Sequence, residues 1–298
     1  MSLHMIDLGL APLANAYLSQ EALGKPEQSY PLRVLVCEGC WLAQVEAFSE
    51  PNEIFQVDYA YFSGYSSTWV EHCKNYAKYM IERFSLGPTS SVIEVGSNDG
   101  TLLRFFSDAS MRCTGIEPTL GTAEAARALG LAVVTEFLTY DLAVLLRTRG
   151  LRADLLVANN VLAHVPDIND FVSACSMLLS DDGVATFEFP HLQELLAGFQ
   201  FDTIYHEHYS YLSLVSVESV FSQAGLMVFD VEQLSTHGGS LRVYAQRSNS
   251  GIHEALPSVA AVRCLESDAG LATPHAYSRL QVEADRIRDE LREFLLGA

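Results

Sequence analysis

The residues best able to do chemistry lie in one segment, residues 201–214, where two histidines flank a glutamate and are themselves flanked by tyrosines. The segment reads Phe201-Asp-Thr-Ile-Tyr-His-Glu-His-Tyr-Ser-Tyr-Leu-Ser-Leu. A histidine whose pKa lies near neutrality, held by a neighbouring carboxylate, is what general-base chemistry needs. A loop packed by its own aromatic rings and a His-x-His metal pair are the alternatives, and we favour general-base catalysis over both.

A second informative stretch is Val92 to Gly100, with the sequence Val-Ile-Glu-Val-Gly-Ser-Asn-Asp-Gly. Its apolar run carries one charge, breaks into small polar residues and resumes at residue 101 as Thr-Leu-Leu-Arg-Phe-Phe, so the hydrophobic period changes from strand-like to helix-like. This pattern predicts a strand, a tight glycine turn and a helix start. Such a turn lets the backbone approach a ligand and directs free N–H groups toward it. The stretch therefore predicts a site for a nucleotide-like cofactor.

Alternating strands and helices are predicted to position both stretches. The expected strands are residues 92–95, 114–117, 132–135, 154–158 and 184–189, and the expected helices are residues 100–108, 120–129, 139–148, 168–179 and 214–224. This alternation is typical of a parallel sheet with helices on both faces. Residues 227–233 and 241–246 are close enough in sequence to pair as an antiparallel hairpin at one sheet edge. Residues 256–297 predict two solvated helices.

Polar residues follow three of the predicted strands, and in an open parallel sheet the ligand binds beyond the carboxyl ends of the strands. The second strand ends at Glu117, 21 residues after Gly96, and a carboxylate there can accept both hydroxyls of a ribose. The residues after the first and fourth strands are Gly96, Ser97, Asn98 and Asp99, and Asn159 and Asn160. These strand ends are the predicted cofactor site.

Two cofactors compete for this arrangement, a dinucleotide and S-adenosylmethionine. The dinucleotide fingerprint Gly-x-Gly-x-x-Gly is not met, because Asn98 stands where the second glycine is required after Gly96. A carboxylate near the first loop, Glu94, suits a sulfonium and an ammonium better than a pyrophosphate. The antiparallel pair at the end of the sheet also favours the methyltransferase version of the fold. The sequence therefore favours S-adenosylmethionine.

The charge balance excludes several classes of partner. The 298 residues include 18 basic and 37 acidic side chains, for a formal net charge of -19. Binding to nucleic acid or to an anionic membrane needs clustered Lys and Arg, so a small-molecule substrate is favoured. No window approaches the roughly 20 uncharged apolar residues of a membrane span, and the first residues lack a signal-peptide pattern. We therefore expect a cytoplasmic protein without a nucleic-acid or membrane partner.

The first part of the chain, to about residue 60, predicts an irregular cap with a few strands. Within it, Cys37 and Cys40 form a Cys-x-x-Cys turn at the end of an expected strand. Thiolates at this spacing can hold a metal ion, but a structural zinc site needs four ligands and no second pair is present. His4 and His72 are possible partners, and neither has a spacing that argues for it. The sequence favours a half-site or a plain turn over a working zinc site.

An aromatic loop follows the cap, with the sequence Asp58-Tyr-Ala-Tyr-Phe-Ser-Gly-Tyr-Ser. It ends at an expected helix over about residues 69–84, for which Ser67 or Thr68 is the predicted N-cap. Its tyrosines either pack between cap and core or bring a phenol to a polar substrate pocket, and the sequence leaves both interpretations open.

Six motifs, spanning about residues 6 to 246 in order, together resemble the nucleotide-sugar C-methyltransferases, S-adenosylmethionine enzymes that branch deoxysugars at C3. The motifs are Leu8-Gly-Leu-Ala-Pro-Leu-Ala-Asn-Ala, Asp58-Tyr-Ala-Tyr-Phe-Ser-Gly-Tyr-Ser, Val92-Ile-Glu-Val-Gly-Ser-Asn-Asp-Gly, Asn159-Asn-Val-Leu-Ala-His-Val-Pro-Asp, Phe201-Asp-Thr-Ile-Tyr-His-Glu-His-Tyr-Ser-Tyr and His237-Gly-Gly-Ser-Leu-Arg-Val-Tyr. The resemblance implies a class I, Rossmann-like α/β fold with a seven-stranded sheet. It also implies that a base removes the acidic proton beside the carbonyl of a dTDP-linked 4-ketosugar, so that the enolate attacks the sulfonium methyl.

The resemblance further implies roles for individual residues. His208 would be the base, with Glu207 and Tyr205 orienting it or the substrate. His164 and a tyrosine of the aromatic loop, Tyr59 or Tyr61, would contact the keto oxygen or the sugar. The implied cofactor residues are Glu94, Gly96, Ser97, Asn98 and Asp99 around the methionine portion, Glu117 at the ribose, and Asn159 and Asn160 on the fourth-strand side.

The chain departs from the family pattern near both ends. The resemblance implies a cap that binds zinc with two cysteine pairs, of which Cys37 and Cys40 would be one. It also implies a carboxy-terminal domain that helps to hold the sugar nucleotide, and we expect most of that domain to be missing here. We expect a cap over residues 1–66, a methyltransferase domain over 67–250 and a helical extension over 251–298. The alternative functions are a weakly active remnant that only binds the cofactor and a methyltransferase acting on oxygen or nitrogen of a small metabolite.

Overall fold

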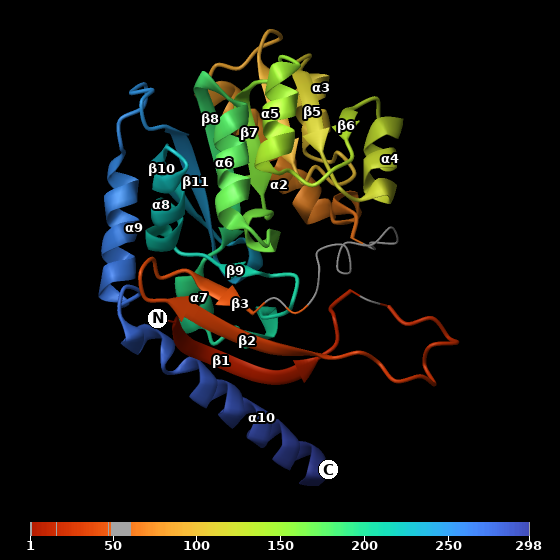
Figure 1. The fold of residues 1–298 in the computed structure, drawn as a ribbon, viewed down its shortest axis with the longest axis vertical. Coiled ribbons are helices and arrows are strands. Elements are labelled where there is room, and N and C mark those ends of the chain that lie inside the picture. The colour runs from red at the N-terminus through yellow and green to blue at the C-terminus, as the bar shows by residue number, and fades with distance from the viewer. Residues whose placement is uncertain (1, 16, 47, 49–60, 298) are drawn as a thin grey trace.

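Two β-sheets organise the molecule, for which a computed structural model describes residues 2–15, 17–46, 48 and 61–297 (Figure 1). A seven-stranded sheet forms the larger body, and a four-stranded antiparallel sheet lies beyond one end of it. The two sheets are adjacent because short elements that follow β8 run between them (Figure 1). The histidine segment, which contains β9 (Ser210–Tyr211), lies in this region between the two sheets.

The larger sheet has the strand order β10-β11-β8-β7-β4-β5-β6. Its strands are β4 (Ser91–Val95), β5 (Arg112–Ile116), β6 (Ala132–Val134), β7 (Ala153–Asn159), β8 (Leu179–Pro190), β10 (Leu226–Leu234) and β11 (Ser240–Arg247). The first five pair in parallel, whereas β11 runs antiparallel to both of its neighbours. The predicted antiparallel pair is thus confirmed at one sheet edge, with β10 outermost.

Helices cover both faces of this sheet, as the alternating pattern predicted (Figure 1). One face carries α2 (Ser67–Arg83), α3 (Leu103–Asp108) and α4 (Leu120–Ala128), and the other carries α5 (Tyr140–Thr148), α6 (Ile168–Leu178) and α8 (Leu214–Gln223). Two apolar clusters form the corresponding cores. Leu156 and Phe187 belong to the cluster under α5, α6 and α8, while Leu155 and Phe106 belong to the cluster under α2 and α3.

Helix α2 starts two residues earlier than the sequence indicated, at Ser67 instead of about residue 69. Its N-cap is Ser66, whose hydroxyl accepts a hydrogen bond from the Trp69 N–H at 3.2 Å. The prediction of Ser67 or Thr68 as the cap was therefore wrong. Three hydroxyl residues in succession all satisfy the N-cap preference, and only the extended backbone of Ser66 decides among them.

The smaller sheet makes the cap more regular than predicted. It has the order β1-β2-β3-β9, formed by β1 (Ser2–Ala11), β2 (Tyr30–Cys37), β3 (Ala43–Val45) and β9 (Ser210–Tyr211). The register of β1 against β2 shifts twice, which disturbs the alternation by which a strand is recognised in sequence. The last strand comes from the histidine segment, far outside the predicted cap, and the predicted domain boundaries stay predictions.

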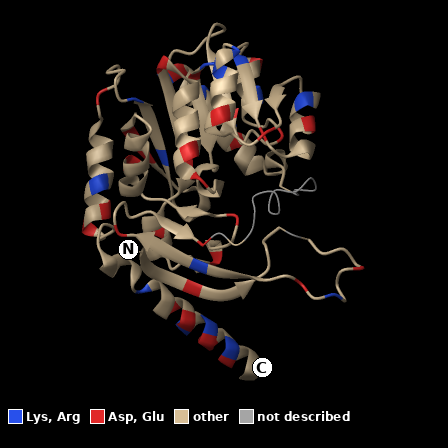
Figure 2. Cartoon of the chain, viewed as in Figure 1, with Lys and Arg blue, Asp and Glu red and all other residues tan. Residues whose placement is uncertain are grey.

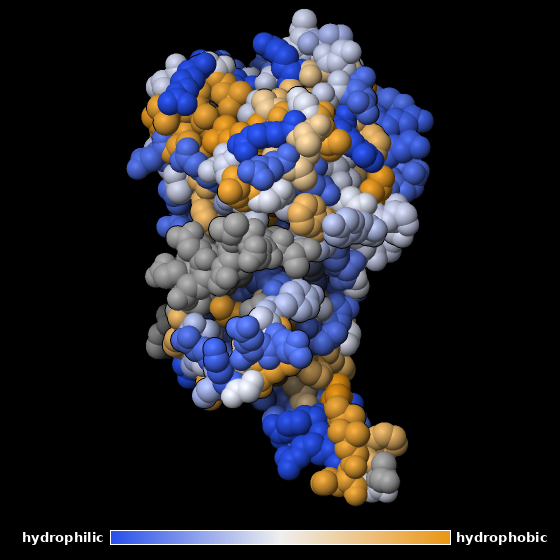
Figure 3. Space-filling view, turned by 90° about the vertical axis from the view of Figure 1, so that its right-hand side faces the viewer, coloured by the Kyte–Doolittle hydropathy of each residue, from blue (hydrophilic) through white to orange (hydrophobic). Residues whose placement is uncertain are grey.

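The chain ends in the two helices that the periodicity predicted, α9 (Pro257–Asp268) and α10 (Leu280–Gly297). Helix α10 projects from the cap sheet, and acidic and basic side chains alternate along it (Figure 2). An apolar strip that includes Phe294 and Leu295 remains exposed on the projecting part (Figure 3). Within the described ranges, none of the helices combines the length and apolarity needed to cross a lipid bilayer.

Candidate active site

A cavity of about 880 Å³ opens at the carboxyl ends of β4, β5 and β7 and extends to the histidine segment. Its lining includes ten of the residues named from sequence, namely Tyr61, Gly96, Asn98, Glu117, Asn159, Asn160, His164, Tyr205, Glu207 and His208. Glu94, Ser97 and Asp99 are not part of the lining. Tyr59 lies outside the described residues. The expected cofactor region and the expected base therefore share one cavity, while the individual roles stay predictions.

The turn after β4 needs its glycines for a steric reason. Gly96 and Gly100 have φ values of +65° and +78°, in the left-handed region that side chains disfavour. A Cβ atom on Gly96 would lie 2.5 Å from a methyl carbon of Val161, on the loop after β7. The glycine thus lets the ends of two neighbouring strands approach each other at the cavity wall.

Glu117 lies at the end of β5 with its carboxylate already oriented. One oxygen accepts from the Asn98 backbone N–H at 2.8 Å, and the other accepts from the Thr119 backbone N–H at 2.9 Å. Each carboxylate oxygen has a second lone pair, so the group can still accept the hydroxyls of a ribose. This geometry fits the role that the sequence suggested.

Three buried polar atoms at neighbouring strand ends have no hydrogen-bond partner: one carboxyl oxygen of Glu94, the hydroxyl of Ser97 and the amide oxygen of Asn159. An unsatisfied buried polar atom is costly, and a ligand with several donors would relieve that cost. Burial raises the pKa of Glu94, and a nearby cation would favour its ionised form. Of these three residues Asn159 lines the cavity, and together with Glu117 it fits a cofactor that carries an ammonium and ribose hydroxyls, whereas Glu94 and Ser97 lie outside the lining.

His208 is held as a neutral imidazole with a defined tautomer. Its Nδ1 atom lies 3.0 Å from the carbonyl oxygen of Thr203, which can only accept, so Nδ1 carries the proton. Its Nε2 atom accepts from the Tyr205 hydroxyl at 2.8 Å. Burial, reinforced by the neighbouring His164, lowers the pKa of His208 to about 3. The geometry therefore leaves Nε2 unprotonated, with its lone pair accepting the hydrogen bond from Tyr205.

His164 lies beside His208, with their ring centroids 4.8 Å apart. Its Nδ1 donates to the backbone carbonyl of Glu207 at 3.0 Å, and burial lowers its pKa to about 4. A neutral imidazole that donates through Nδ1 can only accept through Nε2. In this tautomer His164 can accept a hydrogen bond from a sugar hydroxyl or amine, but it cannot donate one to a keto oxygen. Of its two expected contacts, the geometry therefore favours the one with the sugar.

Glu207 does not orient His208 in the way that the sequence pattern suggested. Its carboxylate oxygen accepts from the side-chain amide of Asn15 at 2.7 Å, while His208 is held by Thr203 and Tyr205. Burial raises the pKa of Glu207 and raises that of Tyr205 to about 12, so the phenol keeps its proton. Of the two roles expected for Glu207, contact with the substrate is the one that the geometry leaves.

Asn15, Trp69 and His237 are among the cavity residues to which the sequence assigned no role. Asn15 and His237 lie within motifs that carried the resemblance, and that position was a signal that could have found them. Trp69 stacks on His72 and meets the edge of His237, with centroid distances of 4.8 and 5.9 Å. Trp69 and His237 therefore form part of one wall of the cavity, with His72 packed behind Trp69.

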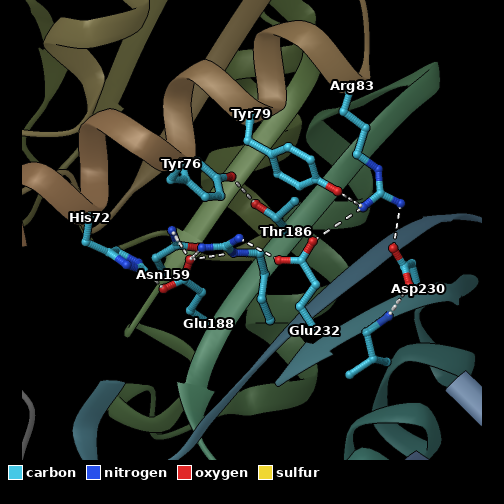
Figure 4. Close-up of polar contacts among 11 residues, drawn as sticks. His72, Tyr76, Tyr79, Arg83, Asn159, Thr186, Glu188, Asp230 and Glu232 are labelled. Atoms are coloured by element: carbon cyan, nitrogen blue, oxygen red, sulfur yellow. Dashed lines mark hydrogen bonds and ion pairs between the residues drawn. The ribbon is translucent and has the colours of Figure 1, made fainter. Parts of the chain in front are cut away.

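A buried ionic network supports this wall (Figure 4). The carboxylate of Glu188, on β8, accepts from His72 Nε2 at 2.8 Å, from Arg242 Nε at 2.6 Å and from the amide of Asn159 at 3.2 Å. Burial opposes its ionisation, but the hydrogen bond from His72 and the charge of Arg242 together lower its pKa. Because His72 is hydrogen-bonded to Glu188, it is not placed as a third ligand for the cysteine pair. Asn159 donates to Glu188 through its amide nitrogen, so its amide oxygen faces away from that carboxylate.

The Cys-x-x-Cys turn follows β2 and joins it to β3. Both thiols are free. Within the described ranges, no group of three or more His, Cys, Asp or Glu side chains is arranged to hold a metal ion. Two thiolates do not fill a four-ligand zinc site, so the described residues do not fit a structural zinc, and the interpretation of the pair as a half-site stays a prediction.

Family models match almost all of the chain. A model described as "Putative zinc binding domain" matches residues 2–55, one described as "Methyltransferase domain" matches residues 69–231, and one described as "C-methyltransferase C-terminal domain" matches residues 235–298. The chain is also 34% identical over 295 residues to the C-methyltransferase NovU of Streptomyces niveus. The matched region covers 99% of this chain and 70% of the relative.

Solved structures show more distant likenesses. Magnesium protoporphyrin IX methyltransferase from Synechocystis PCC 6803, with bound S-adenosylhomocysteine, is 16% identical, with a TM-score of 0.48 over 60% of this chain and 83% of that one. The PH0226 protein from Pyrococcus horikoshii OT3 is 11% identical, with a TM-score of 0.49 over 67% and 100%. The class I methyltransferase fold follows instead from the strand order and the family models. On this evidence the chain belongs to the S-adenosylmethionine-dependent C-methyltransferases.

Proposed function

We propose that this C-methyltransferase acts on carbon 3 of a nucleotide-linked 4-ketosugar in deoxysugar biosynthesis, with His208 as the base. The observation that carries the proposal is the unprotonated Nε2 of His208 on the wall of the cavity that begins at the glycine turn. A methyl acceptor carbon needs a base for its proton, whereas an oxygen or nitrogen acceptor already has a lone pair. The geometry thus favours an acidic carbon as the acceptor.

In the proposed step the bond between carbon 3 and its hydrogen breaks, and the proton moves to Nε2 of His208. The electron pair passes into the bond between carbons 3 and 4, and negative charge develops on the keto oxygen. The Tyr205 hydroxyl, which donates to Nε2 at 2.8 Å in the free protein, has to turn away from Nε2 when that atom takes the proton. Burial raises the pKa values of Tyr205 and Tyr61, so both phenols remain protonated and can then donate to the keto oxygen. Bound S-adenosylmethionine would supply an electrophilic methyl group: the bond from carbon 3 to the methyl carbon would form as the methyl–sulfur bond breaks, and S-adenosylhomocysteine would leave with that electron pair as a neutral thioether.

The charge of the cavity supports a cationic cofactor. Its lining contains Glu117, Glu136, Asp167, Asp170, Asp202 and Glu207, and none of its described lining residues is Lys or Arg. Opposite charge in a partly buried site favours a sulfonium and an ammonium. The same lining offers no cation to a diphosphate. We therefore place the ketosugar ring in the cavity and the dTDP-type diphosphate outside it, in a protein that works in the cytoplasm.

Proton exchange in heavy water tests the proposal. With dTDP-4-keto-6-deoxy-D-glucose and no cofactor, the chain should exchange the C3 proton, as seen by loss of its NMR signal. His208→Asn keeps a donor for Thr203 but lacks Nε2, so the exchange should fall by about 100-fold or more. His206→Gln is the matched control, since His206 contacts the Pro31 carbonyl at 3.1 Å and does not line the cavity. Exchange that survives in His208→Asn would exclude His208 as the base.

A further inference from the structure

The glycine turn after β4 is joined by hydrogen bonds to the end of the aromatic loop, residues 61–66. The amide oxygen of Asn98 accepts from the Ser63 backbone N–H at 2.9 Å, and its amide nitrogen donates to the Tyr61 carbonyl at 3.0 Å. One oxygen of Asp99 accepts from the Gly64 backbone N–H at 2.9 Å. Three bonds therefore connect two segments that are more than thirty residues apart in sequence.

These contacts occupy the polar atoms that the sequence assigned to the cofactor. Both ends of the Asn98 amide are engaged by the loop. The second oxygen of Asp99 accepts from the Thr101 hydroxyl at 2.6 Å and from its backbone N–H at 3.2 Å. Asp99 does not line the cavity. The two side chains are thus arranged to hold protein backbone.

The loop that they hold forms part of the cavity wall on the side of the base. Tyr61 and Ser63 line the cavity, and Ser66 caps the helix that carries Trp69, another lining residue. The packing is close: a Cβ atom on Gly64 would lie 2.8 Å from the carboxylate oxygen of Asp99 and 3.1 Å from the Thr101 hydroxyl. The loop can approach the turn because residue 64 has no side chain.

We propose that Asn98 and Asp99 are positioning residues that fix the aromatic loop as the substrate wall, and that they are not ligands of the cofactor's methionine. The inference rests on the proposed function in that the wall borders the ketosugar. The two residues would act in substrate recognition, because the turn that begins the cofactor site also sets the position of the Tyr61 backbone. Loosening the bonds should weaken substrate binding while leaving the cofactor affinity almost unchanged.

Two variants loosen the contact from opposite sides. Asp99→Asn keeps the shape but can present an amide N–H to the N–H of Gly64, so at least one of the acceptors is lost. Gly64→Ala introduces the 2.8 Å contact from the loop side without changing any group on the turn. Asp108→Asn, at an exposed position, and Gly87→Ala, where a Cβ meets nothing within 4 Å, are the matched controls.

Three measurements separate the outcomes: hydrogen exchange of the peptide over residues 61–66, the Kd of S-adenosylhomocysteine by calorimetry, and the KM for dTDP-4-keto-6-deoxy-D-glucose in the exchange assay. We expect both variants to speed hydrogen exchange and raise KM by about tenfold, because a hydrogen bond to a charged group is worth that much or more. The Kd should change by less than about threefold, well below the effect of losing a charged contact.

A rise of tenfold or more in the Kd of S-adenosylhomocysteine for Asp99→Asn, or unchanged hydrogen exchange in both variants, would overturn the inference. Proton exchange by the wild-type protein distinguishes a failure of the proposed function from a failure of the proposed role of Asn98 and Asp99. If it fails to exchange the sugar proton, the proposed function fails, while hydrogen exchange and the Kd still decide whether the turn holds the loop or binds the cofactor.

Discussion

The buried histidine pair makes the stability of the protein depend on pH in a defined direction. His208 and His164 have folded-state pKa values of about 3 and about 4, against an ordinary value of 6.5. Between these values the unfolded chain binds protons that the folded chain does not, so the free energy of unfolding falls as the pH drops below 6.5. At pH 5, about 1.5 units below the ordinary value, each histidine favours the unfolded state by about 2 kcal/mol.

Urea unfolding of the wild type and of His208→Asn at pH 7 and pH 5 measures this contribution. Acidic residues also titrate in this range, but their contribution is common to both proteins and cancels in the comparison. The wild type should therefore lose about 2 kcal/mol more than His208→Asn between the two pH values. Replacement of the exposed His4 by Asn serves as the control and should leave the wild-type difference intact.

Equal losses in the wild type and in His208→Asn would refute the reasoning, because they would show that His208 is protonated in the folded protein at pH 5. The assay needs neither substrate nor cofactor. It therefore tests the environment of the base even if the identity of the sugar is wrong.

Three further perturbations test other parts of the structure. Gly100→Ala would bring a Cβ to 2.4 Å from a methyl carbon of Leu131, so the free energy of unfolding in urea should fall by about 1–3 kcal/mol. Gly130→Ala, also at positive φ but in open space, is the control and should lower it by less. Equal losses in the two variants would attribute the effect to backbone strain alone. Glu188→Gln removes one of the two carboxylate partners of the buried Arg242, which keeps its ion pair with Glu232 at 2.7 Å. The change should cost about 1–3 kcal/mol of stability by the same assay, whereas a cost below about 1 kcal/mol would mean that solvent reaches the network. A chelator should leave the urea unfolding curve unchanged, since the described residues offer the cysteine pair no third ligand, and one zinc per chain by metal analysis would contradict this.

The sheet was predictable from sequence because each of its strands carries a local signal. The apolar run that breaks at Gly96 and the carboxylate at Glu117 both fall at strand ends, where the chain must turn and where a ligand can bind. Their positions follow from period and spacing within about 30 residues. The same local reasoning gave the two carboxy-terminal helices and the antiparallel edge.

The contacts within the site could not be read from sequence, because they depend on which segments the fold brings together. Glu207 is adjacent to His208 in the chain, which suggested that it orients the base, yet its side chain contacts Asn15. The groups that hold His208 are a backbone carbonyl and the phenol of Tyr205, and a carbonyl has no signature in the sequence. Asn98 likewise has the residue type of a cofactor ligand but is engaged by a loop 35 residues away.

The pairing of β3 with β9 has a consequence for protein engineering. Ser210 and Tyr211 follow His208 by two and three residues, and they complete the edge of a sheet whose other strands come from the first 45 residues. The amino-terminal sheet is therefore not a detachable module. An exchange of this region between relatives, made to alter specificity, would also replace the strand against which the segment of the base is aligned. Chimeras should keep residues 201–214 and the strand β3 from the same parent.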